Sequence, residues 1–337
     1  MRNYETSFMF QDLPPFIKSA IEEELKRFGN KSLAFASEQL SSNYRNATHL
    51  YFTSDIQRAA YLAARAPATY ASVSAVLKEV KRLSQNTEVK SVLDAGAGAG
   101  TASFAVFEMF DEIETLTLIE QDAQMLSIGK RLMNNIFPRA KFVRQNLNDE
   151  SAFEPHDLVV ISYALNEIES KEELLLKAWQ ACQKLLVIVE PGNKNGFANI
   201  LKARSLLMEK GANLIAPCPH SSCCPLTEND WCHFSARLSR SQIHRKAKSA
   251  NLSYEDEKFS YLVFSKTNSS QAIARILRHP LKHKGRVRLT LCTKEGYKVE
   301  TVSARNKENY KRARKTDWGD EWKNEPQRLY RSDKQED

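Results

Sequence analysis

Apolar and polar positions follow two different patterns along this chain. Up to about residue 85, apolar residues recur at helical spacing, as in IKSAIEEELKRF after a pair of prolines and in QRAAYLAARAPATYASVSAVLKEVKRLSQN after Ser54 and Asp55. Proline suits the first turn of a helix, and serine or aspartate suits the position just before it. Residues 1–85 are therefore predicted to form an N-terminal helical region, with Pro67 expected to break or bend its long helix.

From about Lys90 the pattern changes to short β-rich runs separated by helical stretches. The runs are KSVLDAG, TLTLIE, KFVRQNL, DLVVISYAL and LLVIVEP, and the helical stretches include TASFAVFEMF, DAQMLSIGKRLMNN and KEELLLKAWQACQ. Continuous apolar strands that alternate with helices predict a parallel sheet covered on both faces, which is an α/β fold.

The same pattern divides the chain into five expected regions. A cysteine-rich stretch interrupts the α/β pattern, and the strand-like runs FSYLVFSK and GRVRLTLCT follow it. The expected regions are the helical region at 1–85, the Rossmann-like core at 86–210, the Cys-rich insertion at 211–260, C-terminal strands with a basic surface at 261–310, and a tail at 311–337.

Composition places this chain of 337 residues among globular proteins, with 42% hydrophobic and 27% charged residues. No apolar run approaches the roughly 18 residues that a membrane span needs, so no membrane association is expected. The first residues, MRNYETSFMFQDLPP, lack the pattern of a targeting peptide, which favours a cytoplasmic protein. Structural disulfides are then disfavoured, because the cytosol is reducing.

The net charge of +8 is concentrated near the C-terminus. Residues 271–337 hold eighteen Lys or Arg and ten Asp or Glu residues, and within 275–315 the counts are fourteen and three. Tyr297, Tyr310 and Trp318 lie in or beside this block. Cations interleaved with aromatic residues are typical of a nucleic-acid surface, and a solvated basic surface is the alternative.

A glycine-rich loop follows the first predicted strand, in VLDAGAGAGTAS. Gly96, Gly98 and Gly100 alternate, which allows a tight turn and close approach of a ligand to the start of a helix. Asp94 precedes the first glycine, Glu120 closes the second strand, and the glycine spacing differs from a dinucleotide fingerprint. This arrangement resembles the first motif of class I S-adenosylmethionine (SAM) methyltransferases, which implies that these five residues bind SAM.

No catalytic residue is predicted. The fourth strand ends in ISYALNEIES, where Asn166 and Glu167 stand without the prolines of the Asn/Asp-Pro-Pro-aromatic motif of amino-methylating enzymes. A Pro217-Cys218 pair is present, but it follows the fifth strand rather than the fourth, where cytosine-C5 methyltransferases carry their nucleophile. Asn166 and Glu167 either contact an acceptor or, more simply, cap a helix.

Four of the six cysteines lie in CPHSSCCPLTENDWCHF. Cys218, Cys224 and Cys232 are separated by six and eight residues on a loop stiffened by prolines, and such a group of thiolates suits zinc or an iron–sulfur cluster. The candidates for a fourth ligand are His220, Cys223, His233, Cys182 and Cys292.

Two of these candidates are less suitable than the others. Cys182 lies among apolar residues in AWQACQKLL and is expected to be a buried core thiol. Cys223 is adjacent to Cys224, and neighbouring residues seldom both point at one metal. Cys292, on the predicted strand RVRLTLCT, is the best remaining thiolate, and the spacing does not choose between iron and zinc.

Several segments together resemble one protein family. They are YLAARAPATYASV, DAGAGAGTA, YALNEI, EPGNKNGFANIL, APCPHSSCCPL, DWCHFSARLSRS and YEDEKFSYL. From about residue 50 to the WGD at 318–320, the chain resembles the methyltransferase-like family of mitochondrial small-ribosomal-subunit assembly factors and their bacterial relatives. The resemblance implies a Rossmann methyltransferase fold, binding to the small ribosomal subunit and its rRNA, and a [4Fe–4S] cluster on Cys218, Cys224, Cys232 and Cys292.

Two functions are consistent with this sequence. One is a SAM-dependent methyltransferase acting on small-subunit rRNA, and the other is a non-catalytic iron–sulfur assembly factor that docks rRNA. The intact glycine loop favours the first and the missing acceptor motif favours the second. The chain is expected to be monomeric when free, and cytoplasmic as a bacterial relative or in the mitochondrial matrix if eukaryotic.

Overall fold

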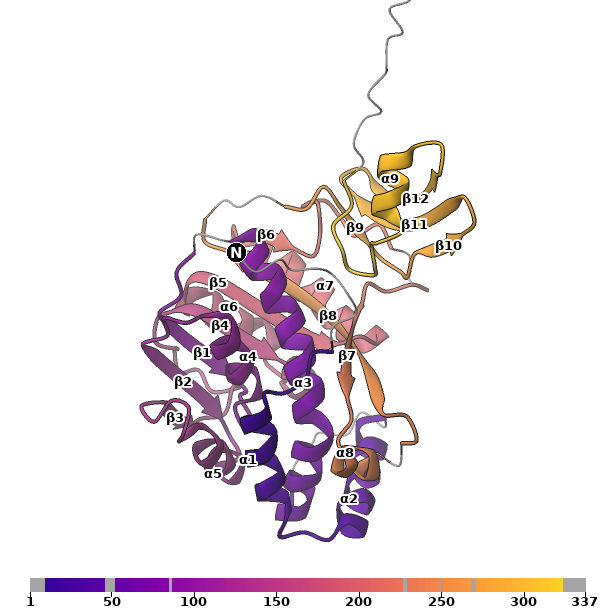
Figure 1. The fold of residues 1–337 in the computed structure, drawn as a ribbon. Helices are drawn as coiled ribbons and strands as arrows, with labels where there is room; N and C mark the ends of the chain where they lie inside the picture. Colours follow the sequence, from indigo (N-terminus) through magenta and orange to yellow (C-terminus); the bar gives the residue numbers. More distant parts are fainter. Residues whose placement is uncertain are drawn as a thin grey trace, which may run out of the picture. The chain divides into compact units, whose positions relative to one another are not determined.

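The computed structural model describes residues 10–45, 52–84, 87–226, 229–248, 250–267 and 271–323. The chain divides into two compact units. The larger contains the described residues up to Pro217 together with Leu226–Gln271, and the smaller contains Cys218–Pro225 together with the described residues from Ala272 onward. Figure 1 shows both units, coloured along the sequence. The smaller unit therefore joins two segments of the chain that lie far apart in sequence.

The N-terminal region of the larger unit is helical, as predicted. Its helices are α1 (Pro15–Leu25), α2 (Asn30–Arg45) and α3 (Asp55–Leu83). Pro67 was expected to break or bend the long helix; a break is excluded, because α3 runs for 29 residues with Pro67 in its interior. Alanine is frequent along α3 and most of its middle is buried, so packing against the rest of the unit holds the helix together.

An eight-stranded sheet forms the centre of the larger unit, in the order β3-β2-β1-β4-β5-β8-β6, with β7 paired to β8. The strands β1 to β5 pair in parallel. The strands are β1 (Ser91–Ala95), β2 (Thr115–Glu120), β3 (Lys141–Arg144), β4 (His156–Ser162), β5 (Cys182–Pro191), β6 (Asn213–Ala216), β7 (Phe234–Ser239) and β8 (Tyr254–Ser265).

The sheet is mixed rather than fully parallel. Strand β8 runs antiparallel to β5 on one side and to β6 and β7 on the other. The stretch 211–260 was expected to be a Cys-rich insertion and 261–310 to hold C-terminal strands, a division that cuts β8 in two. Instead β6, β7 and β8 all belong to the main sheet, so only part of 211–260 lies outside the α/β fold. The result is a Rossmann-like α/β fold with an antiparallel strand next to β5.

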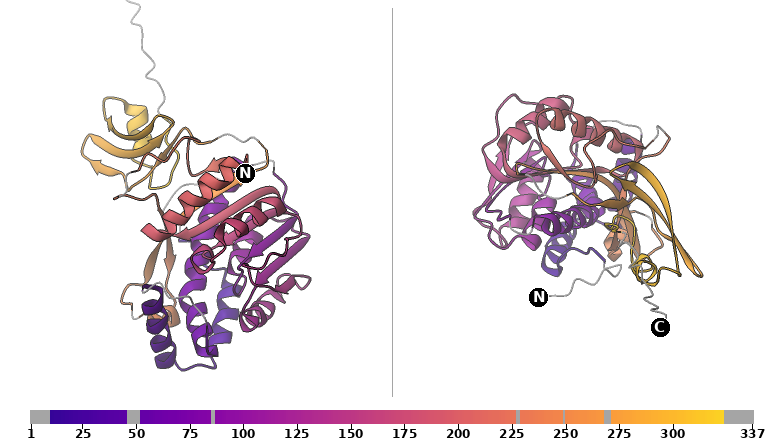
Figure 2. Two further views of the ribbon diagram at one scale, coloured as in Figure 1. Left: turned by 180° about the vertical axis from the view of Figure 1, so that it is seen from behind. Right: turned by 90° about the horizontal axis from the view of Figure 1, so that it is seen from above.

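Helices cover both faces of this sheet, as the alternating pattern predicts. Figures 1 and 2 show α1, α3 and α4 on one face, and α6 and α7 on the other. The central strands are therefore apolar along nearly their whole length, and the residues of β4 and β5 are almost all buried. The remaining helices are α4 (Thr101–Met109), α5 (Ala123–Met133), η1 (Leu165–Glu167), α6 (Lys171–Ala181), α7 (Lys194–Glu209) and α8 (Gln242–Ala247).

The smaller unit contains a four-stranded antiparallel sheet and one helix, α9 (Lys307–Ala313). Its strands are β9 (Ala274–Ile276), β10 (Leu281–His283), β11 (Arg286–Thr293) and β12 (Gly296–Ser303). A separate apolar core holds it together, and this core includes Ala313 and Trp322. Residues 311–323 are therefore part of a folded unit and not a tail, whereas 324–337 lie outside the described residues.

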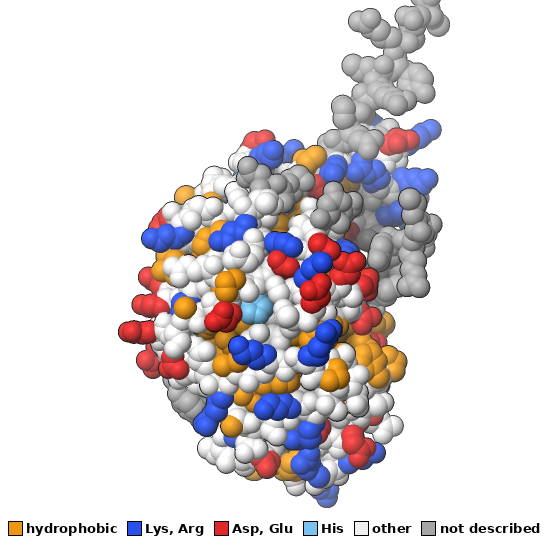
Figure 3. Space-filling view, turned by 90° about the vertical axis from the view of Figure 1, so that its left-hand side faces the viewer, with side chains coloured by type: hydrophobic (Ala, Val, Ile, Leu, Met, Phe, Trp, Pro, Cys, Tyr) orange, Lys and Arg blue, Asp and Glu red, His pale blue; other side chains and the backbone are white. Residues whose placement is uncertain are grey.

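The surface of the larger unit contains charges of both signs. Figure 3 views it from the side on which β2 and β3 lie, and acidic and basic side chains both occur across this face. In the part of the chain that the structure describes, no helix has the length and apolar character to cross a membrane.

Candidate functional site

A cavity of about 740 Å³ opens at the carboxyl ends of β1, β2 and β4. Its wall includes Gly96 and Gly98 after β1, Glu120 at the end of β2, and Ser162 and Tyr163 at the end of β4. In α/β sheets, ligands bind beyond the carboxyl ends of the strands, and this volume lies in the range of small-molecule sites. The cavity is therefore the candidate cofactor site.

The glycine loop has the geometry that its sequence predicts. Gly96, Gly98 and Gly100 all have positive φ, at +77°, +55° and +81°. A Cβ atom at Gly96 would lie 2.9 Å from the Cβ of Ala164, and one at Gly100 would lie 2.9 Å from Leu118 Cδ2. Gly96 and Gly98 line the cavity, whereas Gly100 precedes α4 and packs against β2. The loop needs glycine for both its backbone angles and its close contacts.

Glu120 lies in the cavity wall with both carboxylate oxygens bonded to backbone. Gly98 N donates to Oε2 at 3.0 Å, and Asp122 N donates to Oε1 at 2.8 Å. Burial raises the pKa of Glu120, and these backbone hydrogen bonds oppose the shift. The carboxylate thus joins the glycine loop to the start of α5, and each oxygen keeps further acceptor capacity.

Asp94 is fully buried, and its contacts connect β1 to α4. Its Oδ2 accepts hydrogen bonds from the Oγ of Ser103 at 2.7 Å and from the backbone N of Ser103 at 3.2 Å. Its Oδ1 has no hydrogen-bond partner among the described residues. Burial raises the pKa of Asp94 to about 6, against the lowering effect of Ser103. This carboxyl therefore supports the glycine loop from behind.

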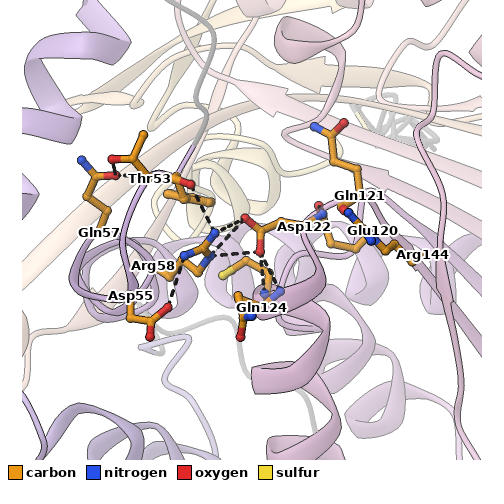
Figure 4. Close-up of polar contacts among 11 residues, drawn as sticks. Thr53, Asp55, Gln57, Arg58, Glu120, Gln121, Asp122, Gln124 and Arg144 are labelled. Carbon is orange, nitrogen blue, oxygen red and sulfur yellow. Dashed lines mark hydrogen bonds and ion pairs between the residues drawn. The ribbon is translucent and has the colours of Figure 1, made fainter.

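An ion pair from α3 lies at the edge of the cavity, and Figure 4 shows it. Arg58 Nε lies 3.0 Å from both oxygens of Asp122, and its Nη2 lies 2.8 Å from Oδ2. Asp122 also caps α5 by accepting from the backbone N of Gln124 and Met125. Burial raises the pKa of Asp122. Arg58 and the capping hydrogen bonds together lower this pKa by more than burial raises it, so the net shift is downward.

Other wall residues were not predicted as site residues. Phe52 precedes α3, Tyr61 lies within it, and Gln145 and Leu147 follow β3. The Nε2 of Gln145 is buried and has no hydrogen-bond partner among the described residues. A buried donor at a cavity wall is costly unless a ligand or water accepts from it. In the sequence, only the position of Gln145 near the end of a predicted strand could have indicated that it lines a site.

The segment after β4 contributes a backbone in a rare conformation. Tyr163 has φ +57°, and its hydroxyl lies 3.0 Å from Ser72 Oγ and 2.9 Å from Glu257 Oε1. Such strain in a residue other than glycine is most frequent at functional sites. Glu167, in η1, lines the cavity, whereas Asn166 accepts a hydrogen bond from Asn199 at 2.8 Å. Only Glu167 of the predicted Asn-Glu pair thus faces the cavity.

The cysteine-rich stretch is divided between the two units. Cys218, Cys223 and Cys224 belong to the smaller unit with Cys292, and Cys232 belongs to the larger. The oxygen of Cys232 accepts from Ser260 Oγ on β8 at 2.7 Å. Cys182 is completely buried at the start of β5, which confirms the expectation of a core thiol, and burial raises its pKa to about 12.

The segment 218–225 lies against β11 and β12 in the smaller unit. The Sγ of Cys292 is 3.4 Å from His220 Nε2, and both side chains are buried. A Cβ at Gly296 would lie 3.7 Å from Pro225. Among the described residues, however, no group of three or more His, Cys, Asp or Glu side chains is arranged to hold a metal ion. The loop thus reaches the strand of Cys292, as expected, and metal binding by Cys218, Cys224, Cys232 and Cys292 stays a prediction.

Comparison with known proteins identifies one family. The family model described as mitochondrial small ribosomal subunit Rsm22 matches residues 55–323. The Rsm22-cox11 tandem protein 2 of Schizosaccharomyces pombe is 27% identical over 365 residues, covering 90% of this chain and 48% of that protein. The human ribosome assembly protein METTL17 is 26% identical over 284 residues, covering 77% of this chain and 61% of that protein. Both relatives are named as mitochondrial, and this chain spans about half to three fifths of their length.

Solved structures share part of the fold at low sequence identity. A proposed RNA methyltransferase from Pyrococcus horikoshii matches with a TM-score of 0.42 and 16% identity, covering 60% of this chain and 85% of that one. Magnesium protoporphyrin IX methyltransferase from Synechocystis, with bound SAM, matches with a TM-score of 0.40 and 12% identity, covering 71% and 98%. With TM-scores below 0.5, neither structure says what this chain binds.

Proposed function

This chain belongs to the Rsm22 family, and from that premise we propose that it acts in the assembly of a small ribosomal subunit, with SAM as the ligand of its cavity. The family model covers both units, and the human relative is named a ribosome assembly protein. Small-subunit rRNA is the proposed partner. Both relatives are named as mitochondrial, which supports the mitochondrial matrix as the location if the protein is eukaryotic. The cytoplasmic location predicted from the first residues has no such support and stays a prediction.

The single observation that carries the SAM proposal is the wall formed by Glu120 and the glycine loop. Glu120 would accept hydrogen bonds from the ribose hydroxyls, while the backbone of Gly96 and Gly98 allows close approach of the amino-acid part. The buried Nε2 of Gln145 is a donor that a ligand acceptor would satisfy. Bound SAM would supply a methyl group that is already activated, so the chain's own residues would mainly position the acceptor.

Asp94 has a different role in this proposal from the direct contact that the sequence suggested. Its bonded oxygen holds Ser103 at the start of α4, so it would support the glycine loop without touching the cofactor. Gly100 acts in the same way, because its missing side chain leaves room for Leu118. Of the five residues predicted to bind the cofactor, Gly96, Gly98 and Glu120 are therefore the proposed direct contacts.

The non-catalytic alternative rests on the segment after β4. That segment carries no recognised acceptor motif, and the Asn166 side chain is bonded to Asn199 on α7 instead of facing the cavity. Binding of SAM would then stabilise the fold and the complex with the subunit, without transfer of a methyl group. Glu167 is the carboxylate of this segment at the cavity and is the first candidate for contact with an acceptor.

One experiment separates the two functions. The tagged protein is purified with its bound small subunits, and the rRNA is mapped for methylated nucleotides in cells with and without the gene. A methylation that disappears in the deletion and in a Gly96→Val strain would establish the enzyme. Unchanged methylation, together with copurifying immature subunits, would establish the assembly factor. Absence of small-subunit rRNA from the purified protein would refute both.

We also propose that Cys218, Cys224, Cys232 and Cys292 bind a [4Fe–4S] cluster, with zinc as the alternative. The support is the number of thiols in 218–232, the few aliphatic residues available to order that loop, and the resemblance to the assembly-factor family. No step of the proposed function depends on the cluster.

The cluster proposal is tested by metal analysis of protein purified without oxygen. Wild-type protein should contain about four irons and four sulfides per chain, and Cys224→Ser should lose both. Cys223→Ser is the matched control, because Cys223 is the exposed neighbour and is not a proposed ligand. One zinc and no iron would replace the cluster by a zinc site, and a folded protein without metal would refute both.

A further inference from the structure

The outward face of the small sheet carries cations together with exposed apolar side chains. Along β11, Arg286 and Arg288 are exposed, while Val287 between them and Leu289 after them are buried in the core of the smaller unit. Because successive side chains of a strand point to opposite faces, the two arginines share the outward face. The two arginines therefore lie outside the packed core of the smaller unit.

The strand register places apolar and polar neighbours beside these arginines. Leu281 of β10 and Thr301 of β12 both lie opposite Arg288, and His283 lies opposite Arg286. A hollow of about 420 Å³ lies among them, lined by Leu281, His283, Arg286, Arg288, Val299 and Thr301. We call these six residues the outward face. None of the six is acidic, so the face has a positive potential.

Large apolar side chains on this side of the sheet are exposed. Leu281 is 53% exposed and Val299 39% exposed, and Tyr297, two residues before Val299 on the same strand, is 49% exposed. Side chains on one strand that are two residues apart point to the same face, so Tyr297 extends the outward face. Apolar groups between arginines offer contact to something flat and apolar that also carries negative charge.

Other cations of the basic block are engaged within the smaller unit. Arg275 is 2% exposed and donates from Nη1 to the Gly319 oxygen at 2.8 Å. The Arg312 guanidinium lies 5.7 Å from the centre of the Trp322 ring, which belongs to the core. The acidic Glu300 of β12 lies opposite Leu289 and thus on the core side of the sheet, where it accepts from Trp322 Nε1 at 3.2 Å. The basic block at 275–315 therefore contains two kinds of cation. Arg275 and Arg312 contact residues within the smaller unit, whereas Arg286 and Arg288 lie on the outward face.

We propose that the outward face binds a single-stranded segment of RNA, with Arg286 and Arg288 on phosphates and Leu281, Val299 and Tyr297 against bases. This inference rests on the proposed function in so far as rRNA is the partner. Single-stranded bases are open to stacking and apolar contact, whereas a duplex presents its backbone and hides the base faces. The combination of cations with exposed apolar groups therefore favours a single strand.

The test is fluorescence anisotropy of the full chain with a labelled twelve-nucleotide single-stranded RNA and with a duplex of the same length. Arg286→Glu with Arg288→Glu should weaken single-strand binding by roughly tenfold or more and reduce the salt slope by about 1.4, because two phosphate contacts are lost. The matched control is Lys307→Glu with Lys311→Glu, which makes the same charge change on the exposed side of α9. This control should change affinity by less than about threefold and leave the slope nearly unchanged.

A second variant separates base contact from charge. Tyr297→Ala with Val299→Ala keeps the net charge and should weaken single-strand binding by roughly five- to thirtyfold with the salt slope unchanged. Equal losses of RNA affinity in the Arg286/Arg288 variant and in the α9 control would overturn the proposal, because they would indicate general electrostatic attraction and not a binding face. A stronger preference for the duplex, or wild-type affinity in both face variants, would also overturn it.

The outcome is separable from that of the proposed function. Association of each variant with small subunits is measured by sedimentation through a sucrose gradient. If wild-type protein cosediments with subunits and the face variants bind the oligonucleotide normally, the face inference fails while the proposed function stands. If wild-type protein neither cosediments nor binds rRNA, the proposed function fails. A face that binds protein rather than RNA would show lost cosedimentation with oligonucleotide binding intact.

Discussion

The cavity of the larger unit and the outward face of the smaller unit differ in how they are built. The cavity is made by loops at the carboxyl ends of buried strands, and its groups are held by the backbone, as Glu120 is held by Gly98. The outward face consists of side chains on exposed strands, with Arg286 and Arg288 separated by a buried valine. The ligand proposed for the cavity is a small molecule of defined shape, and the ligand proposed for the outward face is a long polymer.

This difference predicts that the two regions respond to different kinds of change. A site enclosed by backbone should be lost when a single atom is added, because its neighbours cannot move away. A site made of exposed side chains should lose affinity gradually as charges are removed. Each prediction below changes the larger unit and should leave RNA binding by the outward face intact.

The largest effect is expected for Gly96→Val. The new Cβ would meet Ala164 at 2.9 Å in a backbone conformation of positive φ, so the loop must shift into the cavity or away from it. Affinity for S-adenosylhomocysteine should fall by at least roughly a hundredfold, measured by equilibrium dialysis. Gly211→Val is the control, because Gly211 has a similar φ of +80° but no atom within 4 Å of its Cβ position. Equal losses at both positions would show that backbone strain alone, and not the cavity, is responsible.

A second effect concerns the pH dependence of stability and the buried Asp94. The folded protein holds the Asp94 proton up to about pH 6, whereas an unfolded chain releases it near pH 4. The folded state therefore binds more protons in this window, and the free energy of unfolding falls as the pH rises through it. Asp94→Asn cannot ionise, so its stability relative to wild type should rise by about 2 kcal/mol between pH 4 and pH 7.

Urea unfolding at several pH values measures this difference. Asp111→Asn changes an exposed carboxyl of the same unit and serves as the control. Parallel pH profiles of Asp94→Asn and wild type would contradict the assignment of Asp94 as a buried carboxyl behind the loop.

A smaller effect is expected for Arg58→Lys at the edge of the cavity. Lysine cannot make the bidentate ion pair that Arg58 makes with Asp122. The N-terminal cap of α5, and with it the position of Glu120, should therefore become less well fixed. Affinity for S-adenosylhomocysteine should fall by about three- to tenfold. The control on the same helix is Arg82→Lys, since Arg82 makes a similar pair with Glu79 at the surface. An effect of the same size at Arg82 would remove Arg58 from the site.

The sequence was most informative about the glycine loop and the strand after it, which form one continuous segment. Gly96, Gly98 and Glu120 were predicted because strand, turn, helix and strand follow one another within thirty residues. The Arg58–Asp122 pair was not, because its members are 64 residues apart and Asp122 resembles an ordinary helix cap. From the sequence alone, Asp94 was predicted to contact the cofactor. An acidic residue before a glycine loop has the same sequence pattern whether its carboxyl is buried behind the loop or contacts a ligand.

Long-range pairing limited the prediction of the fold in the same way. The pattern of β8 shows that it is a strand but not that it enters the main sheet between β5 and β6 in the opposite direction. Trp322 lies in a polar stretch, and only the three-dimensional contacts place it in the core of the smaller unit. The cysteine loop was expected to reach the strand of Cys292, and His220 does contact it, but the arrangement of the thiols could not be derived from spacing.

The most direct test of this account is calorimetric titration of the wild-type chain with S-adenosylhomocysteine, in parallel with Gly96→Val. The account predicts one binding site per chain for wild type, no measurable binding for Gly96→Val, and unchanged affinity of both for single-stranded RNA. Absence of binding by a wild-type protein that still cosediments with small subunits would contradict the cofactor site and leave the α/β unit as a scaffold.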